Sequence, residues 1–258
     1  MFNRKEKSDT ESFPSPQVFF IQGIGSRENQ QDSVFVSEAD KYTPQGIMMC
    51  LADGMGGLED GERISKTAVS AVSNTFSVSD KNNTGRLLIA MLKSAVSSVN
   101  ALVCPNYSSG GTTLLLGYAK DGRFYYASVG DSRIYMFRDG DILQLNRQHT
   151  LESELLLHTV NGAMRYDDAV DYEKKGALTS YLGMGGLKYA DIPLAPVNIR
   201  KGDRFALMSD GVFNTIPDGE LAEIFSNDPE KICEAAAAFI EDRKYPGQDN
   251  YSLAFVAF

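Results

Sequence analysis

The spacing of apolar residues along the chain alternates between a period typical of strands and one typical of helices. Residues 1–16 mix charged residues with Ser and Pro and hold no apolar stretch, so we expect them to form a flexible tail. Short β-rich runs at 18–24 and 33–37 predict strands. Residues 46–52 are almost wholly apolar, which predicts a strand buried on both faces.

A helical period replaces the strand period after residue 60. Apolar residues recur every three or four positions in 61–76 and in 86–103, which predicts two consecutive helices. A meander of strands follows, because Asp121-Gly122 and Asp139-Gly140 are strong signals for two-residue hairpin turns. Its strands are expected at 112–119, 123–129, 133–138 and 141–146.

Residues 148–177 show no periodic spacing of apolar residues, and the periodic spacing resumes after them. This long irregular stretch predicts an insertion of the kind that serves as a lid or binding loop. Helices occur in pairs and strands in hairpins, so the expected fold class is α+β, with antiparallel sheets and helices packed outside them in one domain over 17–258. The remaining strands are expected at 191–199, 203–208 and 251–258, and the remaining helices at 217–225 and 229–243.

Composition then narrows the classes of function. The 25 basic and 34 acidic residues among 258 give a net charge of −9, which argues against a nucleic-acid partner and against an anionic membrane surface. No apolar run of about 20 residues is evident, and residues 1–16 lack the features of a secretory signal. Three separated cysteines and two histidines are too few for a Cys/His zinc site, and free thiols indicate a reducing compartment. A cytoplasmic protein is therefore expected.

Five aspartates stand at the ends of predicted strands: Asp32, Asp53, Asp131, Asp210 and Asp249. An unpaired carboxylate at the mouth of a buried strand is costly, so each of them needs a cation or several hydrogen-bond donors. With so few histidines, ligation by oxygen alone favours Mg²⁺ or Mn²⁺. Two such ions can activate a water and neutralise a phosphoryl group. The alternative is a set of scattered turn aspartates.

Arg27 lies five residues before Asp32. A guanidinium group can bind two oxygens of a phosphate at once, which would complete a phosphate-binding site beside the carboxylates. The alternative, on this residue alone, is an ordinary surface arginine.

Seven short motifs occur in a fixed order. They read RENQQD at 27–32, DGMGG at 53–57, GGTT at 110–113, GDSR at 130–133, LTSYLG at 178–183, SDG at 209–211 and DN at 249–250. Because these motifs occur in this order, residues 18–258 resemble the metal-dependent protein phosphatase family (protein phosphatase type 2C), and in particular its compact bacterial branch. The resemblance implies a four-layer α/β/β/α sandwich, in which two central antiparallel sheets are flanked by helix pairs.

The resemblance also implies an activity and a set of catalytic residues. The family hydrolyses phosphoserine and phosphothreonine in proteins, using a water that bridges two Mn²⁺ or Mg²⁺ ions. Asp53 corresponds to the carboxylate that bridges the ions, and Gly54 to the residue whose carbonyl binds the first ion. Asp210 and Asp249 correspond to the remaining carboxylates of the second ion. Arg27 corresponds to the arginine that binds the substrate phosphate.

Further positions have implied supporting roles, and two depart from the family pattern. Asp32 corresponds to a supporting carboxylate that acts through water, and Asp131 to one that holds, with Asp210, a third and weaker ion. Gln31 stands where many relatives carry a glutamate, so one anionic contact to the second ion is expected to be absent. Met55 stands where some eukaryotic relatives carry a histidine proposed as general acid.

The insertion at 148–177 corresponds to the flap of the family, whose sequence varies near the active site. Substrate selection by this flap is a hypothesis. His149, at its start, is interpreted as structural rather than catalytic.

Three other functions remain open alternatives. The first is a catalytically inactive relative that only binds phosphoproteins, against which the presence of Asp53, Asp210 and Asp249 argues. The others are a metal-dependent nuclease, which the acidic balance disfavours, and a metal-dependent small-molecule phosphoesterase. The expected partners are phosphorylated proteins and a cognate Ser/Thr kinase, and the chain is expected to be a monomer.

Overall fold

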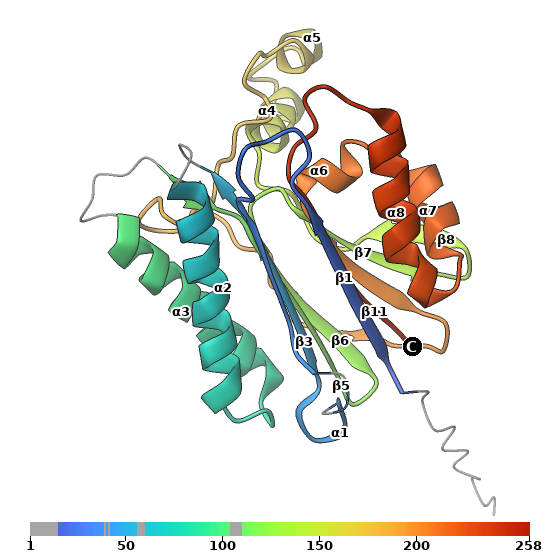
Figure 1. Cartoon of the computed structure of the whole chain (residues 1–258). Coiled ribbons are helices and arrows are strands. Elements are labelled where there is room, and N and C mark those ends of the chain that lie inside the picture. Colours follow the sequence, from blue (N-terminus) through green and yellow to red (C-terminus); the bar gives the residue numbers. More distant parts are fainter. Residues whose placement is uncertain (1–14, 39, 41, 56–59, 104–109) are drawn as a thin grey trace, which may run out of the picture.

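The structure is a computed structural model that describes residues 15–38, 40, 42–55, 60–103 and 110–258. Most of the predicted tail, the two glycines that end the DGMGG motif, and Cys104 lie outside these residues. The described chain forms two antiparallel β-sheets that pack face to face, with helices on both outer faces (Figure 1).

Each sheet joins strands from distant parts of the chain, and every strand pairing is antiparallel. The first sheet has the order β1 (Gln17–Gly23), β11 (Tyr251–Ala257), β10 (Arg204–Met208), β7 (Arg133–Arg138) and β8 (Asp141–Gln144). The second has the order β2 (Asp32–Val36), β3 (Ile47–Met55), β5 (Leu114–Lys120), β6 (Arg123–Val129) and β9 (Val197–Asn198), and β4 (Gly111–Thr112) pairs with β3. Since β1 pairs with β11 along its whole length, the two ends of the described chain meet.

Two pairs of helices complete the sandwich (Figure 1). The first pair, α2 (Asp60–Val78) and α3 (Thr84–Val103), covers the second sheet, and the second pair, α7 (Asp218–Phe225) and α8 (Pro229–Arg243), covers the first. The expected α+β, four-layer α/β/β/α sandwich is therefore confirmed. The insertion carries α4 (Leu151–Val160) and α5 (Tyr166–Val170), and α1 (Tyr42–Gln45) and α6 (Asp210–Phe213) are single turns.

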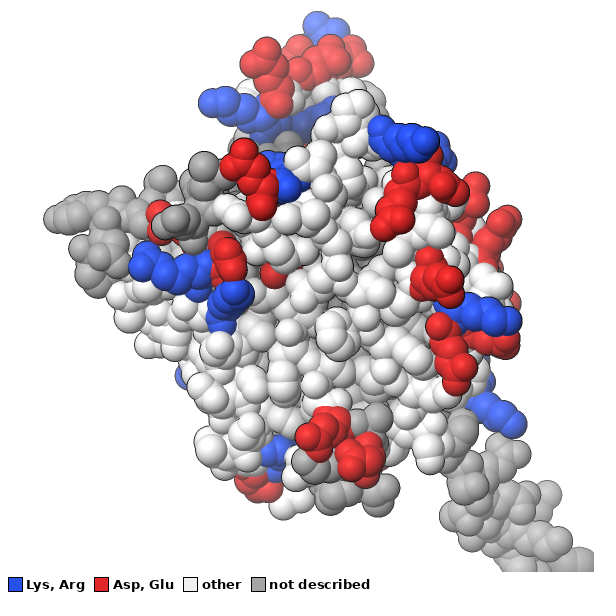
Figure 2. All heavy atoms as spheres, viewed as in Figure 1, with Lys and Arg blue, Asp and Glu red and all other residues white. Residues whose placement is uncertain are grey.

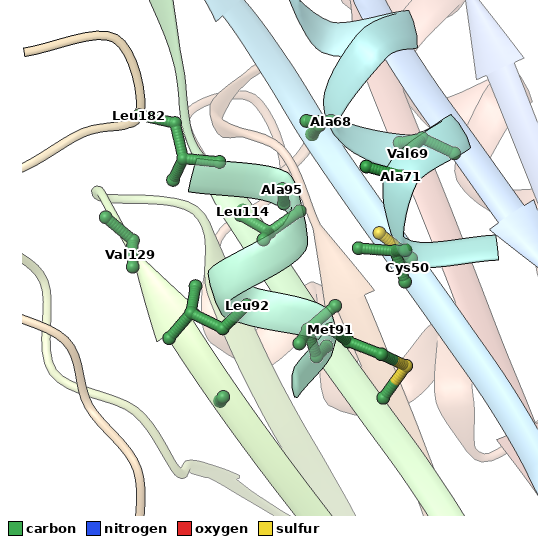
Figure 3. Close-up of a cluster of buried hydrophobic side chains, with 14 of the residues drawn as sticks. Cys50, Ala68, Val69, Ala71, Met91, Leu92, Ala95, Leu114, Val129 and Leu182 are labelled. Atoms are coloured by element: carbon green, nitrogen blue, oxygen red, sulfur yellow. The ribbon is translucent and has the colours of Figure 1, made fainter. Parts of the chain in front are cut away.

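The hydrophobic core has three parts, one between the sheets and one under each helix pair. Strand β3 is buried on both faces, as its apolar run predicts. Met48 and Cys50 pack toward α2 and α3, as Figure 3 shows for Cys50, whereas Met49 and Leu51 pack toward the other sheet. A fully buried side chain of this size contributes roughly 1.5–3 kcal/mol, so the strand that carries Asp53 is firmly held.

The two Asp-Gly hairpin turns form as predicted. Asp121 and Asp139 have φ values of 50° and 55°, and the glycines after them are also left-handed. Two consecutive residues with positive φ define the turn whose twist matches that of paired strands. These two aspartates therefore serve the turns and lie away from the carboxylate cluster described below.

Helix α3 corrects the expectation that no apolar stretch approaches the length of a membrane span. It has 20 residues, and an 18-residue window within it has a mean hydropathy of 1.4, which suffices for a span by length and composition. The helix packs against α2 and the second sheet, and its apolar side chains enter the core there. Its buried residues are Leu87, Leu88, Met91, Leu92, Ala95, Val99 and Val103.

The strand predicted at 191–199 is wrong over most of its length. Only Val197–Asn198 pairs with β6, and Asp191 makes an isolated bridge to Ser128. Pro193 and Pro196 lie in this stretch, and proline has no N–H to donate to a sheet. Ile192, Val197 and Ile199 pack against the core, whereas Leu194 is exposed.

Candidate active site

A pocket of about 410 Å³ opens at the end of the sandwich where the two sheets meet the insertion. Four of the five predicted aspartates line it, and Asp32 lies buried beside them. Arg27 and Gly54 also line the pocket. The structure therefore brings every predicted site residue together, although they come from positions 27 to 249. The lining residues are Arg27, Gln31, Asp53, Gly54, Met55, Thr113, Asp131, Gly176, Ala177, Leu178, Asp210 and Asp249.

Asp53 is fixed at the base of the pocket by its strand neighbours. Its N–H donates to Thr113 Oγ1 at 3.0 Å, and its carbonyl accepts from Thr113 N at 2.9 Å and from Thr112 Oγ1 at 2.8 Å. The prediction that Asp53 ends its strand is wrong, because β3 continues to Met55 by pairing with β4. The backbone of Asp53 is thus held on both sides, and its carboxylate position is set by the sheet.

Asp32 links the two sheets below the pocket. It stands directly opposite Asp53 in the register of β2 and β3, and it is only 3% exposed. Ser209 Oγ, from the end of β10, donates to Asp32 Oδ2 at 2.7 Å and accepts from Ser252 N at 2.8 Å. Burial raises the pKa of Asp32 to about 6 in spite of these hydrogen bonds. Sequence reasoning missed Ser209, although the residue belongs to the SDG motif.

The five carboxylates repel one another. Burial raises the pKa of Asp53 well above its ordinary value, and the charges of Asp32, Asp210, Asp131 and Asp249 raise it further. Burial, followed by the charges of Asp131, Asp249 and Asp32, raises the pKa of Asp210 to about 7. A cluster with this electrostatic strain is stabilised by bound cations, which remove the repulsion.

Arg27 supplies a positive charge at the rim of the pocket. Its Nη2 lies 2.6 Å from Asp249 Oδ2, and both side chains are substantially exposed. The preceding loop is fixed because Ser26 donates to the Gln248 carbonyl from both N and Oγ, at 2.9 and 2.8 Å. Gly25 has a φ of 60°, and a Cβ there would lie 2.3 Å from the Asp249 carbonyl oxygen. A tight, glycine-dependent turn therefore places Arg27 beside the carboxylates.

Gly54 is another position in the pocket where only glycine fits. A Cβ there would lie 2.2 Å from the Gly61 carbonyl oxygen and 2.6 Å from that of Gln31. Its N–H donates to the Gln31 carbonyl at 3.2 Å. The backbone therefore approaches α2 closely at the pocket, and no side chain can shield it.

The oxygen atoms that line the pocket suit a hard divalent cation that retains several coordinated water molecules. Carboxylate and carbonyl oxygens surround the pocket, which is the ligand type that Mg²⁺ and Mn²⁺ prefer. No three His, Cys, Asp or Glu side chains in the described ranges are grouped so as to hold one ion. The resemblance implies that Asp53, Asp210 and Asp249 hold the second ion, and all three line the pocket, with Asp249 paired to Arg27. Mg²⁺ bound in such a site usually keeps several water molecules.

Two residues near the pocket have structural roles. His149 Nδ1 accepts from Gly130 N at 3.1 Å, and burial lowers its pKa, which supports the structural interpretation. Asn250 belongs to the DN motif, but no role was predicted for it from the sequence. Its Oδ1 accepts from Gln31 N and its Nδ2 donates to the Ile24 carbonyl, both at 2.8 Å, so it ties the Arg27 loop to β11.

The insertion reaches the pocket at its C-terminal end. Gly176 and Ala177, with the adjoining Leu178, line the wall opposite the aspartates. Ala177 O accepts from Leu151 N at 2.8 Å, so this wall is tied to the start of α4. A substrate bound in the pocket would lie near this segment, which fits the hypothesis that it selects substrates.

Comparison with known proteins agrees with this fold and site. The serine/threonine phosphatase Stp of Listeria innocua is 28% identical over 237 residues, which cover 89% of this chain and 90% of Stp. The serine/threonine phosphatase of S. agalactiae has a TM-score of 0.80 at 24% identity, over 94% of this chain and 99% of that one. The catalytic domain of PstP, solved with two manganese ions, has a TM-score of 0.73 at 24% identity, over 94% and 97% of the two chains.

The sandwich is thus the fold of serine/threonine phosphatases, and its acidic pocket lies where the two sheets end. The family model described as protein phosphatase 2C matches residues 23–241, so the chain belongs to the protein phosphatase 2C family. The family resemblance inferred from the seven motifs is confirmed.

Proposed function

We propose that this serine/threonine protein phosphatase hydrolyses phosphoserine and phosphothreonine in proteins with the help of divalent cations held in the aspartate pocket. The observation that carries the proposal is the convergence of five mutually repelling carboxylates with Arg27 in one pocket. Membership of the family and the name of the Listeria innocua relative, a serine/threonine phosphatase, support the reaction class.

The residues of the pocket are proposed to have different roles in the reaction. Asp53, Asp210, Asp249 and the Gly54 carbonyl would hold two Mn²⁺ or Mg²⁺ ions, and bound ions of this kind activate water and neutralise a phosphoryl group. The two manganese ions in PstP support this number and this metal. Asp32, through Ser209, keeps the two sheets in register below the ions.

A third, weaker ion is proposed between Asp131 and Asp210. Both carboxylates line the pocket, and burial, followed by the charge of Asp131, raises the pKa of Asp210. By its correspondence to the family pattern, this third ion is expected to bind least tightly of the three.

Arg27 is proposed to bind the substrate phosphate. A guanidinium can donate two parallel hydrogen bonds to phosphate oxygens, and it orients the phosphorus toward the ions. When the ions occupy the pocket they compete for Asp249, which would release Arg27 for the substrate.

The proposed partners are phosphorylated proteins and a Ser/Thr kinase that acts on the same substrates, in the cytoplasm, with the enzyme as a monomer. On the face shown in Figure 2, Lys and Arg side chains lie singly or in small groups beside Asp and Glu, and the middle of the face carries no charge. Nucleic-acid binding requires a continuous basic surface, so this face offers no support for such a partner.

A substrate comparison tests the reaction class. With Mn²⁺ present, we expect turnover of a phosphothreonine peptide to exceed that of a sugar phosphate by at least about tenfold in kcat/KM, because a peptide also contacts the pocket rim and the insertion. Phosphate release from both substrates is the measurement. A preference for the sugar phosphate would instead identify a small-molecule phosphoesterase, and binding without release of phosphate would identify an inactive phosphoprotein-binding module.

Replacement of Arg27 tests the phosphate-binding role. Arg27→Ala should raise KM for the phosphopeptide about tenfold or more, since charge-assisted hydrogen bonds to phosphate are lost. Its affinity for Mn²⁺, measured by calorimetry, should hold or rise, because Asp249 loses its competing partner. Equal losses of metal and substrate binding would refute this role.

A further inference from the structure

A second pocket, of about 510 Å³, adjoins the active site. It shares Asp210 and Asp249 with the aspartate pocket, so the two cavities meet at these carboxylates. Apart from these two aspartates, no residue that lines the second pocket has a role in the proposed hydrolysis. Its lining residues are Asp210, Gly211, Asn214, Thr215, Arg243, Tyr245, Gly247, Gln248 and Asp249.

The floor of this second pocket is held rigidly by Gln248. The Gln248 side chain is only 7% exposed, and its Nε2 donates to the Gly211 carbonyl at 2.9 Å. Thr215 Oγ1 donates to Gln248 Oε1 at 2.7 Å, and Gln248 N donates to the Tyr245 carbonyl at 3.0 Å. One buried amide thus joins the start of α6, the turn after it and the loop before β11. A cavity with a fixed floor binds a ligand with little cost in ordering.

Arg243 brings a positive charge to the pocket wall. It is the last residue of α8, and its Cζ lies 4.9 Å from the centre of the Phe239 ring, which restrains the guanidinium. No carboxylate of the described chain forms an ion pair with it. Tyr245 follows within two residues and is 63% exposed. A restrained cation beside an exposed aromatic ring offers a binding surface for an acidic side chain.

We propose that this second pocket is a specificity subsite that accepts an acidic side chain of the substrate protein, with Arg243 as its recognition residue. The inference rests on the proposed function, because the phosphorylated residue must occupy the aspartate pocket. An extended peptide advances about 3.3–3.6 Å per residue, so an acidic residue within about three positions of the phosphorylated one spans the shared edge. Cations bound by Asp210 and Asp249 would remove the repulsion of these carboxylates toward that side chain.

The test compares phosphothreonine peptides of equal length that carry Glu, Ala or Lys within three positions of the phosphothreonine. The wild-type protein should favour the Glu peptide over the Ala peptide about fivefold in kcat/KM, through KM, as expected for a partly exposed ion pair. Arg243→Ala should remove this ratio, Arg243→Lys should keep most of it, and Arg243→Glu should shift the preference to the Lys peptide. Each variant is judged by its ratio between peptides, so a general loss of activity does not affect the result.

Two controls separate the possible failures. Arg86→Ala removes an exposed arginine outside both pockets and should keep the wild-type ratio. p-Nitrophenyl phosphate reports phosphatase activity without any flanking residue. Loss of wild-type activity toward this compound and all the peptides would overturn the proposed function. Activity with no preference for Glu, or a preference that survives in Arg243→Ala, would overturn the subsite alone.

Discussion

Removal of divalent metal with EDTA should lower phosphopeptide turnover at least about 1,000-fold, and excess Mn²⁺ should restore it. Bound cations are worth several kcal/mol to the transition state of phosphate hydrolysis, and each 1.4 kcal/mol is a factor of ten in rate. The remaining positive group near the phosphate would be Arg27, which is held by Asp249 in the structure. Turnover and protein-bound metal should be measured on the same sample.

The same titration should change stability. A ligand that binds only the folded protein raises its melting temperature, and here it also relieves repulsion among Asp53, Asp210 and their neighbours. We therefore expect the melting temperature to rise with Mn²⁺ concentration, and to keep rising with its logarithm above the dissociation constant. Full turnover by protein verified to be free of metal would contradict the proposed mechanism, whatever the change in stability.

Local patterns in the sequence predict helices and strands well where the spacing of apolar residues follows a single period, either that of a helix or that of a strand. The predicted bounds of β6, β7 and α8 agree with the structure, and the two Asp-Gly turns have the expected backbone. The error at 191–199 has a local cause that was visible in the sequence, namely Pro193 and Pro196. Alternating apolar residues suggested a strand, but the two prolines remove the donors that a strand needs.

The sequence predicts which residues form the candidate site, but it does not predict which of them contact each other. The motifs name the aspartates, yet the contact of Arg27 with Asp249 joins residues 222 apart, and that of Ser209 with Asp32 joins residues 177 apart. Such contacts depend on which strands become neighbours, which hydrophobic periodicity does not specify. The extension of β3 past Asp53 likewise depends on pairing with β4, a strand of two residues.

Asp53→Asn should lower turnover at least about 1,000-fold and, in the metal-free protein, raise the melting temperature by several degrees. The amide keeps the shape of the side chain but removes the carboxylate proposed to bridge two ions. It also removes a charge that four neighbouring aspartates disfavour, so the folded protein gains stability. The rise in melting temperature caused by Mn²⁺ should be largely lost.

Asp121→Asn is the matched control for this substitution. Asp121 is also followed by glycine, but it lies in a hairpin turn with a φ of 50°, a conformation that asparagine tolerates well. The control should keep both turnover and the response to Mn²⁺. Undiminished turnover in Asp53→Asn would exclude Asp53 as the bridging ligand. A metal-free variant that melts below the wild-type protein would show that the Asp53 carboxylate stabilises the fold instead of opposing it. We expect lost activity together with gained stability because the Asp53 carboxylate is needed to bind cations, whereas in the metal-free protein it is repelled by the neighbouring carboxylates.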